Sequence, residues 1–324
     1  IMNQLRKEGT AIVYISHKLA EIRRICDRYT VMKDGSSVCS GMVSDVSNDD
    51  IVRLMVGREL QNRFNAMKEN VSNLAHDTVF EVRNVTSRDR KKVRDISFSV
   101  CRGEILGFAG LVGSGRTELM NCLFGVDKRA GGEIRLNGKD ISPRSPLDAV
   151  KKGMAYITES RRDNGFFPNF SIAQNMAISR SLKDGGYKGA MGLFHEVDEQ
   201  RTAENQRELL ALKCHSVNQN ITELSGGNQQ KVLISKWLCC RPEVIIFDEP
   251  TRGIDVGAKA EIYKVMRQLA DDGKVILMVS SELPEIITVC DRIAVFCEGR
   301  LTQILTNRDD MSEEEIMAWA LQQE

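Results

Sequence analysis

The chain has 324 residues, of which 42% are hydrophobic and 28% charged, and this predicts a globular protein rather than a disordered one. Its 45 Lys and Arg residues balance 45 Asp and Glu residues, which argues against a nucleic-acid-binding function. Nine cysteines without a CxxC or His/Cys cluster favour reduced thiols and a cytosolic compartment. No apolar run approaches the ~20 residues that span a bilayer, so any membrane role is expected to be peripheral.

The first residues follow a helical pattern and lead into a predicted strand at Ala11–Ile15, and this region repeats near the C-terminus. Seven residues recur at one ungapped offset (273 − 9 = 264): Gly9, Ser16, Glu21, Cys26, Asp27, Arg28 and Gly35 recur as Gly273, Ser280, Glu285, Cys290, Asp291, Arg292 and Gly299. We therefore predict that residues 1–57 close a first domain that begins before this chain, that 58–78 form a linker, and that 79–324 form a complete second copy.

A glycine-rich turn follows the predicted strand Ile105–Ala109 and precedes a helix. It fits the phosphate-loop pattern GxxxxGK[ST] except at the lysine: Gly110, Leu111, Val112, Gly113, Ser114, Gly115, Arg116, Thr117. Glycines let backbone N–H groups turn toward phosphate oxygens, and the helix N-terminus adds a favourable dipole. We expect this loop to bind the phosphates of ATP, with Thr117 a ligand of Mg²⁺. Taken alone, it also fits an ordinary strand-to-helix turn.

Two carboxylates, Asp248 and Glu249, end the apolar strand at 244–247. The carboxyl edge of a parallel sheet is where open α/β folds bind ligands. Asp248 suits a contact with Mg²⁺, and Glu249 suits the base that orients an attacking water.

A second anion-binding pattern, which we call the signature segment, is residues 224–231. It reads Leu224, Ser225, Gly226, Gly227, Asn228, Gln229, Gln230, Lys231 before a predicted helix. Two phosphate cradles in one domain make sense if the second contacts ATP that is held by a partner domain.

Together with Thr251–Asp255 and Ile157–Arg162, these motifs resemble the second nucleotide-binding domain of bacterial monosaccharide importers of the ATP-binding cassette (ABC) type, the ribose, galactose and xylose class. The resemblance covers the whole chain. It implies an α/β P-loop NTPase fold of the ABC ATPase type, with a mixed or parallel central sheet, an antiparallel β subdomain and a helical subdomain at about 165–230. It also implies an ATPase that energises monosaccharide import, and overall similarity within the class favours D-allose as the sugar.

The same resemblance implies the partners. These are transmembrane permease subunits, a periplasmic sugar-binding protein that acts indirectly, and a possible second copy of the chain, at the cytoplasmic face of the inner membrane. No nucleic acid is expected. Permease coupling is expected between Thr158 and about Lys188, where the aromatics at 166–167 could equally be core of the helical subdomain. A ribosome- or DNA-acting cassette protein and a non-hydrolysing scaffold are the competing interpretations.

Several positions depart from a working ATPase. Arg116 replaces the loop lysine, Thr158 stands where such cassettes carry a glutamine, and Ser281 occupies the repeat position of His17, the histidine expected to face the γ-phosphate. No aromatic residue is available between Phe80 and Phe98 to stack on adenine. We expect this site to bind ATP and to hydrolyse it poorly. The productive site would combine a first domain's loop with His17 and the signature segment.

Overall fold

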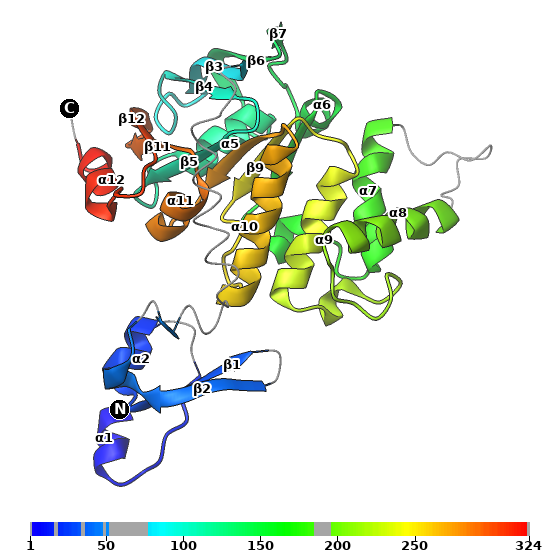
Figure 1. Ribbon diagram of the computed structural model, residues 1–324. Helices are drawn as coiled ribbons and strands as arrows, with labels where there is room; N and C mark the ends of the chain where they lie inside the picture. Colours follow the sequence, from blue (N-terminus) through cyan, green and yellow to red (C-terminus); the bar gives the residue numbers. More distant parts are fainter. Residues whose placement is uncertain are drawn as a thin grey trace. The chain divides into compact units, whose positions relative to one another are not determined.

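The computed structural model describes residues 2–15, 19–33, 36–47, 50–51, 77–184 and 196–322. The chain divides into two compact units, residues 1–67 with 254–261 and residues 68–253 with 262–324. Figure 1 shows the elements of both. Among the described residues, every helix is too short or too polar to cross a bilayer.

Up to residue 47, the described part of the first unit includes two short helices, a hairpin and a 3-10 turn: α1 (Met2–Lys7), α2 (Leu19–Ile25), β1 (Arg28–Lys33), β2 (Ser36–Met42) and η1 (Val43–Asp45). The strands β1 and β2 pair antiparallel, with a register shift between Val31 and Met32.

Residues 11–15 form no strand, so that prediction is wrong. Val13 and Ile15 are 92% and 94% exposed. A parallel strand needs hydrogen-bonding neighbours, and the described part of this unit contains only the β1–β2 hairpin.

The large unit is built around a six-stranded sheet in the order β12-β11-β5-β10-β9-β8. All neighbours pair parallel except β11 and β12. The strands are β5 (Ile105–Gly110), β8 (Met154–Ile157), β9 (Val244–Asp248), β10 (Val275–Val279), β11 (Arg292–Cys297) and β12 (Arg300–Thr306). The side chains of β8, β9 and β10 are buried throughout, as expected for strands covered on both faces.

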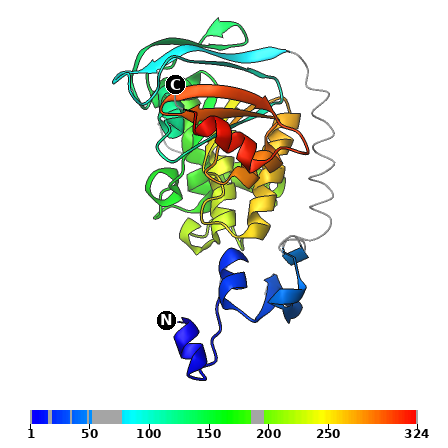
Figure 2. The ribbon, with the colours of Figure 1, turned by 90° about the vertical axis from the view of Figure 1, so that its left-hand side faces the viewer.

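A second, antiparallel sheet has the order β4-β3-β6-β7. Its strands are β3 (Thr78–Ser87), β4 (Ile96–Cys101), β6 (Arg129–Leu136) and β7 (Lys139–Asp140). Figure 2 shows it across one end of the large unit. Phe98 packs edge-on against Phe108 of β5, with ring centroids 5.4 Å apart, so the two sheets share one apolar core.

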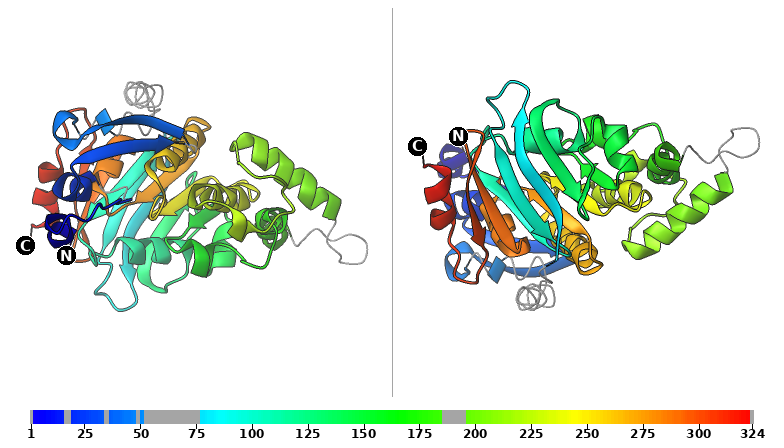
Figure 3. Two further views of the ribbon diagram at one scale, coloured as in Figure 1. Left: turned by 90° about the horizontal axis from the view of Figure 1, so that it is seen from below. Right: turned by 90° about the horizontal axis from the view of Figure 1, so that it is seen from above.

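The remaining elements are helices and short turns: α5 (Arg116–Phe124), α6 (Pro146–Lys151), η3 (Arg161–Gly165), α7 (Ile172–Asp184), α8 (Glu196–Leu209), η4 (Ile221–Glu223), α9 (Gly226–Leu238), α10 (Val256–Asp271), α11 (Leu283–Val289) and α12 (Glu313–Ala320). In Figure 3, α7, α8 and α9 gather on the side of the large unit away from α12. They enclose a separate core that includes Phe166, Ile172, Met176 and Leu233.

The 264-residue offset seen in the sequence also relates the local structures of the two copies. The bounds of α2, β1 and β2, each shifted by that offset, are the bounds of α11, β11 and β12. The hairpins share a register shift, between Val31 and Met32 in one copy and between Val295 and Phe296 in the other. The two copies therefore share a helix and a hairpin, including the position of the register shift in the hairpin.

Candidate functional site

The glycine-rich loop leaves β5 at Gly110 and enters α5 at Arg116. Gly110, Gly113 and Gly115 have φ angles of 146°, 82° and 104°, where residues with a side chain are strained. A Cβ at Gly115 would lie 2.3 Å from the Lys92 carbonyl oxygen. The Ser114 hydroxyl is buried and has no partner among the described residues. The loop therefore presents a donor that an acceptor oxygen could satisfy.

Arg116 lies inside the protein rather than in solvent, with 7% of its surface exposed. Its Nη1 donates to the Ser280 carbonyl oxygen at 2.6 Å and makes a longer contact of 3.5 Å with the Phe108 carbonyl oxygen. Burial lowers the pKa of Arg116, while Glu249 and Asp248 act in the opposite direction. The cation at the lysine position is thus bound to the loop that follows β10.

Asp248, at the end of β9, lies beside Thr117, the other residue that the sequence analysis assigns to Mg²⁺. Thr117 Oγ1 donates to Asp248 Oδ1 at 3.2 Å, and the Tyr156 hydroxyl donates to Asp248 Oδ2 at 2.9 Å. Burial raises the pKa of Asp248, against the two hydrogen bonds and the charge of Arg116. This close pair of oxygen ligands suits a hard cation such as Mg²⁺. Tyr156 was not predicted, because its role depends on β8 lying next to β9.

Glu249 adopts a left-handed backbone conformation, with φ of 50°. Its N–H donates to the Val279 carbonyl oxygen at 2.9 Å, and Ser281 Oγ donates to its Oε2 at 3.1 Å. Burial raises the pKa of Glu249, while the Ser281 hydrogen bond and Arg116 lower it. A raised pKa makes the carboxylate a better proton acceptor, and left-handed strain is common at functional sites.

A buried carboxylate that sequence reasoning missed connects the loops after β9 and β10. Thr251 Oγ1 donates to Glu285 Oε1 at 2.6 Å, and Ser280 Oγ donates to Glu285 Oε2 at 2.9 Å. Glu285 was visible in the sequence only as one of the repeated residues. Because Arg116 binds the carbonyl of the same Ser280, the three loops at this edge of the sheet are tied together.

Thr158, which follows β8, has a buried hydroxyl without a partner among the described residues. A buried hydroxyl without a partner costs free energy, so a ligand or water that supplies one would be favoured there. His17 lies outside the described residues, so only its repeat counterpart Ser281 can be placed.

The signature segment begins α9, with Ser225 as the residue before the helix. The Ser225 hydroxyl makes no bond to the helix backbone and instead accepts from Asn228 Nδ2 at 3.0 Å. Gln229 is buried and its side chain donates to the Leu224 carbonyl oxygen at 3.1 Å. Within the described residues, the segment makes no hydrogen bond to the glycine-rich loop. The segment thus provides a second helix N-terminus, separate from that of α5 after the glycine-rich loop.

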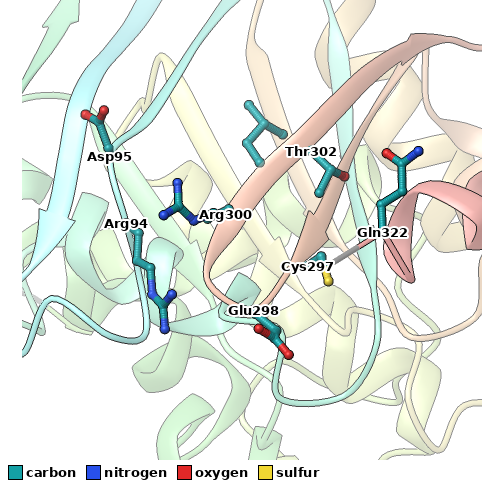
Figure 4. Close-up of a pocket in the computed structure, with 8 residues that line it drawn as sticks. Arg94, Asp95, Cys297, Glu298, Arg300, Thr302 and Gln322 are labelled. Carbon is teal, nitrogen blue, oxygen red and sulfur yellow. The ribbon is translucent and has the colours of Figure 1, made fainter. Parts of the chain in front are cut away.

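Figure 4 shows a pocket elsewhere on the large unit. Its lining residues are Arg94, Asp95, Cys297, Glu298, Arg300, Leu301, Thr302 and Gln322. None of the predicted site residues is among them. Because opposite charges line it together, it lacks the one-signed field that would select an anion.

Comparison with known proteins identifies the fold of the large unit and an ABC transporter domain within it. The ABC transporter family model matches residues 93–252, which contain the glycine-rich loop, the signature segment and the two carboxylates. Among solved structures, the ATP-binding cassette MJ1267 of an ABC transporter aligns with a TM-score of 0.63 at 22% identity, covering 76% of this chain and 99% of that one. The large unit therefore has the ABC ATPase fold, as predicted.

Curated relatives are similar over the whole chain. The D-allose import ATP-binding protein AlsA of Escherichia coli (strain K12) is 99% identical over 324 residues, and a ribose import ATP-binding protein, RbsA of Bacillus cereus, is 44% identical over 322. The chain thus contains an ABC transporter domain and is similar over its whole length to ABC-type import ATP-binding proteins. It spans 64% and 63% of the lengths of those two relatives.

Proposed function

We propose that the chain is part of the ATP-binding subunit of an ABC importer that takes up a monosaccharide, D-allose. The main observation in support is that a strained glycine loop leads directly to the Thr117–Asp248 pair. Within this loop, the buried Ser114 hydroxyl has no partner among the described residues. The 99% identity to a D-allose import ATP-binding protein supports the choice of sugar. In this proposal residues 79–324 are the second nucleotide-binding domain, and residues 1–57 belong to a first one.

In the proposed site, Gly110, Gly113 and Gly115 shape the loop around the phosphates of ATP, and Ser114 donates to a phosphate oxygen. Thr117 and Asp248 would hold the Mg²⁺ that accompanies ATP, a cation that neutralises charge developing on the transferred phosphate. Glu249 orients a water and accepts its proton, which its raised pKa favours.

We further propose that this loop binds ATP but hydrolyses it slowly. The contact of Arg116 with Ser280 directs the cation into the protein, so bringing it to a phosphate costs a buried hydrogen bond. The Ser281 hydroxyl contacts Glu249, which leaves it less able to replace a histidine at the γ-phosphate. One lost donor to a developing charge typically costs about 3 kcal/mol, or roughly a hundredfold in rate.

The signature segment would serve a second ATP, held by the loop of a first cassette and contacted by His17. The Ser225 hydroxyl, which makes no bond to the helix backbone, and the helix N-terminus at Gly226 and Gly227 support this role. In this arrangement Asn228 and Gln229 fix the segment, through bonds to Ser225 and to the Leu224 carbonyl.

The membrane partners follow from an importer function: permease subunits, an indirectly coupled periplasmic sugar-binding protein, and a possible second copy of the chain. The protein would act at the cytoplasmic face of the inner membrane. On the helical subdomain, Phe166 is buried in the core, whereas Phe167 and Phe170 are 47% and 37% exposed and stack at 5.1 Å. This exposed aromatic pair is our candidate for permease contact.

The test uses the full-length protein with its permease in proteoliposomes, measuring D-allose uptake, ribose uptake and ATP hydrolysis. We expect Ser225→Arg to lower hydrolysis about a hundredfold or more and to abolish D-allose uptake. His215→Arg, which adds the same side chain at an exposed site of the same subdomain, should change neither. Wild-type hydrolysis by the Ser225→Arg protein would show that the signature assignment is wrong, and ribose uptake without D-allose uptake would overturn the sugar.

A further inference from the structure

The turn η3 follows β8 and is a π-helical turn, an uncommon form that often occurs at functional sites. The Ser160 hydroxyl caps it by accepting from the Asp163 N–H at 3.3 Å, and the Phe166 N–H closes it on the Arg161 carbonyl oxygen at 3.1 Å.

Arg161 joins two loops that the chain separates widely. Its Nη1 donates to the Gly226 carbonyl oxygen at 3.0 Å, and its Nη2 donates to the Gly253 carbonyl oxygen at 3.3 Å. Gly226 is the first residue of α9 and belongs to the signature segment, and Gly253 lies in the loop after Glu249. One planar guanidinium thus fixes the start of the signature helix against the loop that carries the proposed base.

Further contacts attach η3 and a residue just before it to the same two regions, the signature helix α9 and the loop after Glu249. Glu159, just before η3, forms an ion pair with Arg252. At the other end of η3, the Lys236 ammonium donates to the Gly165 carbonyl oxygen and lies 5.0 Å from the centroid of the Trp237 ring. Both Lys236 and Trp237 belong to α9, so η3 is attached to the signature helix at each end.

Packing leaves little freedom for η3 to shift on α9. A Cβ at Gly165 would lie 2.8 Å from Leu233 Cδ1, so the backbone of the turn rests directly on the helix side chains. Lys236 is only 7% exposed. Removing its buried bond would leave a carbonyl oxygen without a donor. The turn and the helix should therefore move together.

We propose that Arg161 is a positioning residue, which holds the signature segment in register with the loop after Glu249 so that the two nucleotide sites change conformation together. This inference rests on the proposed function, because the signature segment must contact a second ATP for its register to matter. In this proposal Arg161 acts through the signature segment and the loop after Glu249 rather than through its own contact with ATP.

The geometry predicts how much function each substitution of Arg161 should retain. A lysine has a single ammonium and cannot reproduce two divergent donors at fixed spacing, so Arg161→Lys should restore only part of the function lost in Arg161→Ala. Arg162 is the neighbouring exposed arginine, and Arg162→Ala is the matched control for the loss of a positive charge.

The experiment measures permease-stimulated ATP hydrolysis by the full-length protein with Arg161→Ala, Arg161→Lys, Arg162→Ala, Ser225→Ala and the Arg161→Ala/Ser225→Ala double variant. We expect Arg161→Ala to lower kcat about tenfold to a hundredfold, the usual scale for misplacing a catalytic group, with KM for ATP changing less than about threefold. The double variant should be no slower than Ser225→Ala alone, because both changes act through one segment.

Amide hydrogen exchange separates positioning from general destabilisation. In Arg161→Ala, faster exchange should be confined to the first turn of α9 and residues 249–253, with Tm close to that of Arg162→Ala. Multiplicative losses in the double variant, or wild-type kcat in Arg161→Ala, would overturn the inference while leaving the proposed function intact. Normal hydrolysis by Ser225→Ala would instead count against the proposed function, and the positioning role of Arg161 would then lose its basis as well.

Discussion

Replacing Arg116 by lysine tests whether the inward contact of this side chain weakens nucleotide binding. In the structure its Nη1 bonds the Ser280 carbonyl oxygen at 2.6 Å within a buried environment. Hydrogen bonds to charged groups contribute about 1.5 to 3 kcal/mol, so releasing the guanidinium toward a phosphate should weaken ATP binding roughly tenfold to a hundredfold. A lysine ammonium lacks the planar fork that holds the present contact.

We therefore expect Arg116→Lys to bind a fluorescent ATP analogue with Mg²⁺ about tenfold more tightly than the unaltered chain, in an equilibrium titration. Arg116→Met is the matched control, because it keeps an apolar stem and removes every donor. It should bind more weakly than Arg116→Lys, and its free energy of unfolding in urea should fall by about 1 to 3 kcal/mol, because the Ser280 carbonyl loses its donor. Equal affinity of Arg116→Lys and the unaltered chain would refute the reasoning.

Three further outcomes follow from the same site. Gly115→Ala should destabilise the chain in urea unfolding by at least about 1 kcal/mol more than Gly113→Ala. Both glycines have positive φ, but a Cβ at Gly115 would lie 2.3 Å from the Lys92 carbonyl oxygen, whereas a Cβ at Gly113 would meet open space. Equal losses of stability in the two variants would contradict this. Burial raises the pKa of Asp248 above its ordinary value of 3.8. Between the ordinary pKa and the raised one, the folded state binds more protons than the unfolded state, so the free energy of unfolding falls as the pH rises through the folded pKa. Asp248→Asn should therefore raise Tm at neutral pH, with a gain that shrinks toward about pH 4; a gain independent of pH would contradict the assignment. Tyr156→Phe, which removes a donor to buried Asp248, should cost about 1 to 3 kcal/mol in urea unfolding, and an unchanged midpoint would show that the bond is dispensable.

Local pattern predicted most of the elements that form the site. The strands at 105–109 and 244–247, the glycine loop and the helix after the signature segment were predicted from short stretches and are confirmed. At the start of α12, Ser312 accepts from the Glu315 N–H at 3.2 Å, while the Glu315 side chain pairs with Arg308 rather than with the helix start.

Contacts between distant residues could not be predicted in this way. The bond from Arg116 to Ser280 spans 164 positions, and that from Tyr156 to Asp248 spans 92. Which partner a polar side chain finds depends on the order of the strands in the sheet, and one sequence does not reveal that order. For the same reason the pattern could predict that Arg116 would be an unusual phosphate ligand, but not that it would be held inside the protein.

The segment at residues 11–15 shows how far local sequence determines structure. Its repeat counterpart is β10, where Val279 is 1% exposed and lies between β5 and β9, whereas Ile15 is 94% exposed and outside any strand. The α2 helix and the β1–β2 hairpin keep the form of their counterparts, because their hydrogen bonds close within the segment. A central parallel strand draws its hydrogen bonds and its burial from neighbours far away in the chain. Residues 11–15 have the sequence of a strand, but they become one only where strands equivalent to β5 and β9 lie on both sides.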